Sequence, residues 1–110
     1  MLIGKYYHNI DVKGRATIPT KFREGLGASV VLSEGRNGCI SIYSTDKWAA
    51  FEAELLALRT PDARKLRLAI FGGASDVTSD AQNRILIPPS LREYAGLSKD
   101  IVIVGLSDHA

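Results

Sequence analysis

One segment of this chain occurs twice, as an internal repeat. Residues 11–24 return as residues 80–93, shifted by 69 positions without a gap. Phe22 and its counterpart Leu91 are both large and apolar. The identical pairs are Asp11 and Asp80, Arg15 and Arg84, Ile18 and Ile87, Pro19 and Pro88, Arg23 and Arg92, and Glu24 and Glu93. Each copy is too small to bury a core alone, so we expect the two copies to pack around a shared core.

Composition restricts the classes of protein to consider. A chain of 110 residues has room for one compact domain and little for a separate catalytic domain. A hydrophobic share of 45% with 24% charged residues is that of a globular protein, which excludes wholesale disorder. The net charge of +2 does not by itself indicate nucleic acid, but residues 1–23 hold five cations against one acid. Such a cluster either attracts phosphates or forms a solvated face.

The chain offers little for catalysis or metal binding. Cys39 is the only cysteine, and no Cys and His cluster has metal-ligand spacing, so we predict no metal and no cofactor. Among candidate nucleophiles and bases, Cys39 is expected as a small buried residue inside a strand, and His109 as disordered near the terminus. His8 has no partner for nucleophilic catalysis, and we predict that the protein is not an enzyme. With no long apolar run, we expect a cytoplasmic protein without membrane contact.

The repeated segments predict two turns of one shape. Tyr6–Ile10 and Ala16–Ile18 have the composition of short strands, and the Lys-Gly step between them predicts a β-hairpin. Gly14 allows a positive φ in this turn at no steric cost. Asn83 occupies the equivalent position, and asparagine is the next most tolerant residue, so both turns meet the same backbone requirement.

Short helices are expected after both turns. They cover residues 20–26 and 89–95, begin after Ile-Pro, and end at Gly27 and Gly96. Further strands are expected at residues 30–32, 39–43 and 101–104.

A helical hairpin is expected between the repeats. Its first helix begins at Ser44 or Thr45, and its second begins near Pro61 and ends at Gly72 and Gly73. The apolar stripe of the first helix consists of Trp48, Phe51, Leu55 and Leu58. We therefore divide the chain into residues 1–45, the first repeat, residues 46–72, the helical connector, and residues 73–110, the second repeat.

Arg15 is the strongest candidate for contact with a ligand. Asp11 either accepts hydrogen bonds from turn amides or pairs with Arg15, and Asp80 and Arg84 repeat this pattern. Lys13 and Arg15 surround a glycine at the tip of the expected hairpin. Such a tip can enter a DNA groove, where arginine is the usual bidentate partner of guanine.

Two roles are possible for Arg23 and Arg92. Each is followed by a glutamate on a short helix. A structural arginine tied to a carboxylate or a helix end is favoured, and contact with phosphate is the alternative.

These motifs resemble one known family. Asp-x-x-x-Arg followed by Ile-Pro and Phe-Arg-Glu, its second copy at residues 80–97, the helix of Trp48 and the Gly-Gly-Ala at residues 72–74 resemble the MraZ family of bacterial transcriptional regulators. The resemblance implies an α+β fold of two tandem swapped-hairpin units of the AbrB/MazE type, forming a barrel-like core with flanking helices. Family members carry a further strand and helix after position 110, so the second unit is expected to expose a strand edge along residues 101–104.

The resemblance also implies a function. It predicts a repressor that binds double-stranded DNA at promoters with short GTG-containing direct repeats, controls the division and cell-wall gene cluster, and lies at the nucleoid. It places Lys13, Gly14 and Arg15 on the DNA-contacting hairpin and Arg84 at the paired position, with Asp11, Asp80, Arg23 and Arg92 as parts of the structural motif. A ring-forming homo-oligomer is expected as well. The alternative is a protein-interaction module of the antitoxin type, because the same hairpin fold serves there.

Overall fold

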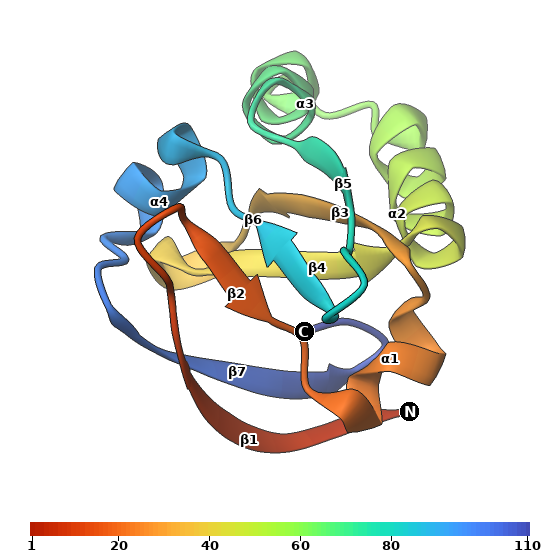
Figure 1. Cartoon of the computed structure of the whole chain (residues 1–110). Coiled ribbons are helices and arrows are strands. Elements are labelled where there is room, and N and C mark those ends of the chain that lie inside the picture. The colour runs from red at the N-terminus through yellow and green to blue at the C-terminus, as the bar shows by residue number, and fades with distance from the viewer.

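The computed structural model describes residues 1–110 as an α+β fold of seven strands and four α-helices (Figure 1). The strands are β1 (Leu2–Asn9), β2 (Arg15–Thr17), β3 (Ser29–Glu34), β4 (Ile40–Ser44), β5 (Ser75–Thr78), β6 (Arg84–Leu86) and β7 (Asp100–Ser107). The α-helices are α1 (Thr20–Leu26), α2 (Thr45–Ala57), α3 (Ala63–Gly72) and α4 (Pro89–Ala95), and η1 (Arg36–Gly38) is a short 3-10 helix. None of the helices has the length and apolar character that crossing a membrane requires.

The two repeats exchange their strands. β1 of the first repeat pairs antiparallel with β7 of the second, and β5 of the second pairs antiparallel with β3 of the first. β2 and β6, which are equivalent, pair with each other. Ala16 lies opposite Ile85, its own repeat counterpart. The repeats are therefore related by a pseudo-two-fold axis that passes near this pair.

The β1–β7 and β3–β5 pairs have equivalent registers when a two-residue insertion in the second repeat is taken into account. Tyr6 lies opposite Ile103, and Ser75, the counterpart of Tyr6, lies opposite Leu32. Two residues separate α1 from β3, whereas residues 96–99 separate α4 from β7. The second repeat thus has two more residues before its long strand, and the pairing after this loop follows the same symmetry.

The predicted local hairpin is wrong in its strand partners. The tight turn is present, since the Asp11 amide donates to the Arg15 carbonyl at 2.9 Å. The flanking strands, however, share only the bridge between Ile10 and Ala16. An isolated two-stranded hairpin is marginal in water, and pairing with the other repeat instead encloses a common core.

The core draws on both repeats, as expected from the internal repeat. Its helix residues include the counterparts Phe22 and Leu91, and each is only 1% exposed. The Phe22 ring packs edge-on against Tyr6, with ring centroids 5.1 Å apart. The buried cluster consists of Leu2, Ile10, Ala16, Ile18, Phe22, Leu26, Val30, Leu32, Ile42, Ile85, Ile87, Leu91 and Ile103.

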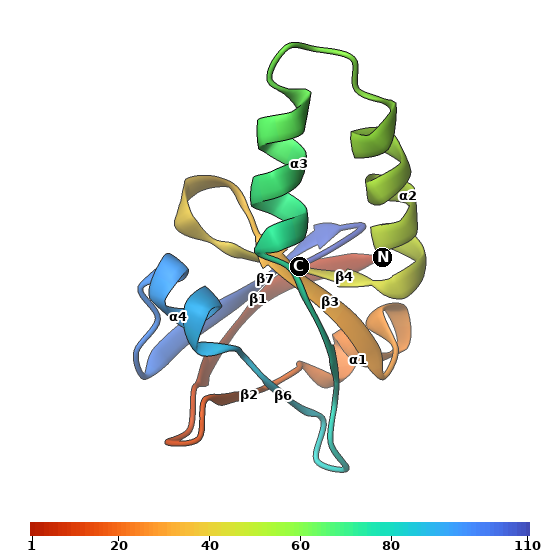
Figure 2. The ribbon, with the colours of Figure 1, turned by 90° about the horizontal axis from the view of Figure 1, so that it is seen from above.

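The helical hairpin α2–α3 projects from this body (Figure 2). Of the two predicted N-cap residues, Ser44 and Thr45, the structure uses Ser44, whose hydroxyl accepts a hydrogen bond from the Lys47 amide at 3.2 Å. The predicted apolar stripe of α2 is only partly covered. Leu55 alone is buried, whereas Trp48, Phe51 and Leu58 remain half-buried because the hairpin meets the body only at its base.

Two predictions for single residues are wrong. Cys39 is exposed and precedes β4, because the turn through η1 ends in an extended residue at the surface. His109 is not detached: its ring stacks on Tyr43 with centroids 4.8 Å apart, and its Nδ1 lies 2.7 Å from the Asp108 carboxylate. Two backbone hydrogen bonds between Ala110 and Ile42 hold this segment against β4.

The exchanged pairing predicts which of two adjacent residues in β6 contributes more to the stability of the fold. Ile85 is 1% exposed, whereas Leu86 beside it is 52% exposed. We expect Ile85→Ala to lower the free energy of unfolding by about 2–5 kcal/mol through lost burial and a residual cavity. The matched variant Leu86→Ala should lower it by less than about 1 kcal/mol. Urea unfolding followed by circular dichroism measures both, and equal losses would contradict the shared core.

Candidate nucleic-acid interface

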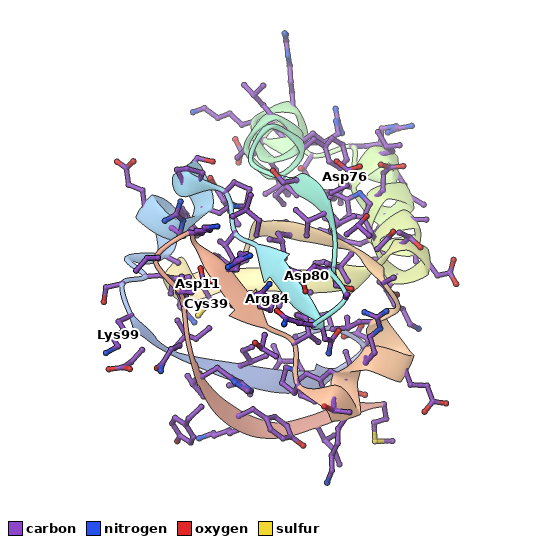
Figure 3. The ribbon with its side chains drawn as sticks, in the orientation of Figure 1. Asp11, Cys39, Asp76, Asp80, Arg84 and Lys99 are labelled. Atoms are coloured by element: carbon purple, nitrogen blue, oxygen red, sulfur yellow. The ribbon has the colours of Figure 1, made fainter.

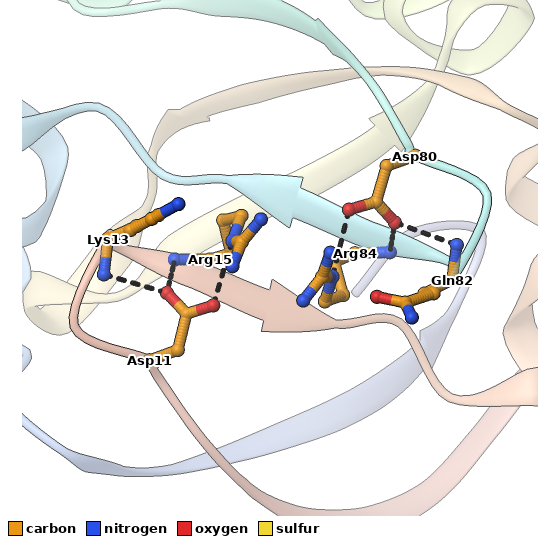
Figure 4. A network of polar contacts seen from close by, with 6 residues as sticks. All are labelled: Asp11, Lys13, Arg15, Asp80, Gln82 and Arg84. Atoms are coloured by element: carbon orange, nitrogen blue, oxygen red, sulfur yellow. Dashed lines mark hydrogen bonds and ion pairs between the residues drawn. The ribbon is translucent and has the colours of Figure 1, made fainter.

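β2 and β6 form a two-stranded ribbon with an inner and an outer face. Ala16 and Ile85 point into the core. Because successive side chains alternate across a strand, Arg15 and Arg84, each one position earlier, lie on the outer face. Figure 4 shows the two arginines side by side on this ribbon, related by the pseudo-two-fold axis.

Asp11 organises the first turn. Its Oδ1 accepts hydrogen bonds from the amides of Lys13 and Arg15, both at 2.9 Å. Its Oδ2 accepts a third bond from Arg15 Nε at 2.8 Å. One carboxylate therefore fixes both the backbone of the turn and the direction of the Arg15 side chain.

Asp80 repeats this arrangement in the second turn. Its Oδ1 accepts from the amides of Gln82 and Arg84 at 2.9 Å, and its Oδ2 accepts from Arg84 Nε at 2.8 Å (Figure 4). The two turns thus share one hydrogen-bond pattern although only their aspartate and arginine are identical.

The ion pairs leave part of each guanidinium free. Arg15 and Arg84 bond their aspartates through Nε, and their Nη groups make no hydrogen bond within the chain. Their side chains are 29% and 28% exposed. An arginine held at Nε keeps its outer donors in a fixed direction, so pairing with aspartate and contact with a ligand are compatible.

The same bonds change the acidity of the aspartates. Hydrogen bonds to the backbone amide of Arg15 are the main cause that lowers the pKa of Asp11 below its ordinary value of 3.8. The amide of Arg84 does the same for the pKa of Asp80. In each case the arginine side chain adds a hydrogen bond and a favourable charge interaction. Both carboxylates are therefore ionised throughout the neutral range.

The tips have the backbone conformation that the sequence predicted. Gly14 has a φ of 85° and Asn83 a φ of 62°, both in the left-handed region. A side chain at Gly14 would meet the Arg92 guanidinium, with a Cβ only 2.8 Å from its Cζ. Glycine therefore suits the left-handed turn, and a Cβ at this position would displace the end of the Arg92 side chain.

Arg23 and Arg92 each reach the turn of the other repeat. Arg92, on α4, lies against Gly14 and donates from Nε to the Ile87 carbonyl at 2.9 Å. Arg23, on α1, donates to the side chains of Ser79 and Asn83, the latter at 2.9 Å. Neither bonds a carboxylate or a helix end. The sequence has no local signal for these contacts, because the Arg23 partners lie 56 and 60 positions away.

Both turns lie on the side of the molecule opposite the α2–α3 hairpin (Figure 2). Figure 3 shows Asp11, Asp80 and Arg84 together on the face of β2 and β6. The first turn also carries the exposed Lys13, where the second carries the uncharged Gln82. The face therefore combines fixed arginine donors with unequal charge at its two tips.

Comparisons with known proteins match nearly the whole chain. The family model described as "MraZ protein, putative antitoxin-like" matches residues 1–68 and again residues 70–109. "Transcriptional regulator MraZ" of Acetivibrio thermocellus is 48% identical over 109 residues, which cover 97% of this chain and 76% of that protein. The protein of the same name from Caldicellulosiruptor saccharolyticus is 47% identical over 108 residues, which cover 96% and 76%. The solution structure of PHS018 from Pyrococcus horikoshii aligns with 99% of this chain and 94% of its own chain, at 14% identity and with a TM-score of 0.43.

The lowered pKa values predict how acid affects the fold. A carboxyl whose pKa is lower in the folded state contributes stability above its unfolded pKa and loses it as the pH falls through the folded pKa. We expect the contribution of Asp11 and Asp80 to be full from pH 7 to pH 5, to decrease as the pH falls below about 4, and to be lost only below the lowered pKa values of the folded state. In urea unfolding at several pH values, Asp11→Asn/Asp80→Asn should lose less stability on acidification than the wild type.

Asp62→Asn is the matched control, because the Asp62 side chain makes no capping bond at α3. It should keep the acid response of the wild type. An unchanged acid response in Asp11→Asn/Asp80→Asn would contradict the role given to the two carboxylates.

Proposed function

The chain belongs to the MraZ family, and from this premise we propose that it is a sequence-specific DNA-binding repressor that reads DNA with the outer face of β2 and β6. The observation that carries the proposal is the pair of arginines held at Nε with free Nη donors. The proposed sites are promoters with short GTG-containing direct repeats, upstream of the division and cell-wall gene cluster.

The shape of the ribbon supports this use. The major groove of B-DNA admits a two-stranded β-ribbon, and arginine pairs bidentately with O6 and N7 of guanine. Arg15 and Arg84 lie on the solvent side of such a ribbon, with their aspartates preventing rotation about the last side-chain bonds. Less conformational entropy is then lost when the guanidinium meets a base.

The two turns are proposed to contribute unequally. Lys13 adds an exposed cation at the first tip, whereas Gly14 is buried against the Arg92 guanidinium and supports the contact only by shaping the turn. Gln82 at the second tip has no charge. We therefore assign base reading to Arg15 first and to Arg84 second, with Lys13 contributing a phosphate contact.

Several copies acting together would supply the affinity. One subunit offers few cations on this face, so its phosphate contacts alone give weak and salt-sensitive binding. A homo-oligomer, such as a ring, presents identical faces to successive repeats. Each engagement then raises the effective concentration for the next one.

Arginine substitution tests the base contact. We expect Arg15→Ala to weaken binding to a GTG direct-repeat duplex by about 10- to 100-fold, because it removes a bidentate donor. Arg84→Ala should weaken it less. Fluorescence anisotropy measures binding to this duplex and to one with the GTG triplets replaced, and Arg15→Ala should reduce the difference between them.

Two controls separate DNA contact from folding. Arg15→Lys keeps the charge but loses the fork of donors, so it should keep salt-dependent binding and lose preference for GTG. Lys65→Ala removes a cation from α3, on the side away from the turns, and should bind like the wild type. Undiminished binding and preference in Arg15→Ala would remove Arg15 from the interface.

The number of repeats tests the role of self-association. We compare duplexes of equal length that carry one or three GTG repeats. The three-repeat duplex should bind at least about tenfold more tightly at low protein concentration, because later contacts are intramolecular. A gain of only about threefold, the statistical effect of three independent sites, would show that the subunits bind separately.

A further inference from the structure

The first turn carries an apolar side chain at its tip. Val12 is 102% exposed, so no part of the chain covers its side chain. The Gly14 amide donates to the Asp11 carbonyl at 3.0 Å, which makes Val12 and Lys13 the two central residues of a β-turn. Asp11 Oδ1 also accepts a hydrogen bond from the Lys13 amide at 2.9 Å. The turn therefore presents Val12 to solvent on a fixed backbone.

The fold gives no reason for a valine at this position. Glycine, proline, asparagine, aspartate and serine are the usual turn residues, whereas β-branched residues prefer strands. Burial does not account for Val12 either, because its side chain packs against nothing. A scattered exposed apolar residue is ordinary on a protein surface, but Val12 precedes the exposed Lys13 and lies three positions before Arg15, in the proposed DNA-binding region.

The second turn has the same arrangement. The Asn83 amide donates to the Asp80 carbonyl at 3.0 Å, so Ala81 occupies the position of Val12. Ala81 is likewise apolar and exposed. Both tips thus combine an exposed apolar side chain with an arginine three positions later, although the residues between them differ in charge.

The major groove of DNA offers one apolar group on its base edges. Thymine carries a C5 methyl group there, which apolar side chains contact, whereas guanine presents the acceptors that pair with arginine. Val12 and Arg15 therefore suit two different bases. Both residues belong to one closed turn, and successive bases of a strand are only about 3.4 Å apart along the helix axis. Neighbouring bases are thus within reach of the two side chains.

We propose that Val12 reads the C5 methyl group of the thymine in the GTG triplet, beside the guanine that Arg15 contacts. The inference rests on the proposed function, since it requires the first turn to enter the major groove. In a GTG triplet one thymine stands between two guanines, and the complementary strand has none. Val12 covers this methyl group and removes both apolar surfaces from water. Ala81 has a smaller apolar surface, so the contact is assigned to the first turn.

Deoxyuridine tests this contact, because it pairs with adenine as thymine does and lacks only the C5 methyl group. Fluorescence anisotropy compares a duplex of three GTG repeats with the same duplex carrying dU in the triplets. The wild type should bind the dU duplex at least about fourfold more weakly, which is the contribution expected of one buried methyl group. A third duplex, with dU only outside the triplets, should bind like the thymine duplex.

Substitutions assign the effect to Val12. Val12→Ser replaces the apolar side chain by a polar one and should bind the thymine and dU duplexes equally. Val12→Thr keeps one of the two methyl groups and should keep part of the difference. Because Val12 is fully exposed, neither variant should alter the fold. Leu68→Ser is the matched control: it removes a 74% exposed apolar side chain from α3, on the side away from the turns, and should respond to dU like the wild type (Figure 2).

Three results would overturn the inference. The first is equal binding of the thymine and dU duplexes by the wild type. The second is an equal loss on dU replacement in the wild type and in Val12→Ser, which would assign the effect to the shape or flexibility of the DNA. The third is a loss that occurs only when dU stands outside the triplets.

Failure of this inference is distinguishable from failure of the proposed function. If the wild type bound the GTG duplex no better than a duplex with the triplets replaced, the proposed function would fail, and this contact with it. If the wild type kept its preference for GTG and ignored dU, only the role of Val12 would fail. Arg15 contacts guanine, so its contribution does not depend on the methyl group.

Discussion

The antiparallel pairing of β2 with β6 is the contact on which the rest of this structure depends. It places Ala16 and Ile85 in the shared core and, by strand alternation, turns Arg15 and Arg84 outward. The ladder continues past the strand ends, since the Ile18 amide donates to the Asn83 carbonyl at 2.8 Å. Burial on one face and display of cations on the other are therefore consequences of a single register, and a slip of one residue would reverse both.

Contacts between the repeats hold the turns in place. Arg23 bonds Asn83 in the turn of the other repeat, and the Arg92 guanidinium covers Gly14 in the first turn. Asp11 and Asp80 then fix the direction of the outward arginines. The outer donors are positioned by a chain of contacts that begins in the core, which is the arrangement that precise recognition of a base requires.

Local features of this fold follow from sequence, whereas the partners of its elements do not. Asn83 could be assigned a positive φ because its counterpart is Gly14, and residue type alone restricted the N-cap of α2 to Ser44 or Thr45. Periodicity cannot say which strand a neighbour will pair with, so the local hairpin was predicted where the repeats exchange strands. The contact of Arg23 with Asn83 joins residues that are 60 positions apart, and no local sequence pattern predicts such a contact.

Burial was harder to predict than secondary structure. Cys39 has the apolar character of a core residue, but the turn before β4 places it at the surface. Trp48 has the right spacing for a core stripe, yet the α2–α3 hairpin meets the body only at its base and leaves the ring half-covered.

A structure of the protein bound to a duplex with GTG direct repeats would show which face of the molecule meets the DNA. We expect the ribbon of β2 and β6 in the major groove, with Arg15 Nη atoms within hydrogen-bond distance of a guanine edge and Arg15 Nε still bonded to Asp11. A duplex bound at another face, or an Arg15 side chain directed away from the bases, would contradict it.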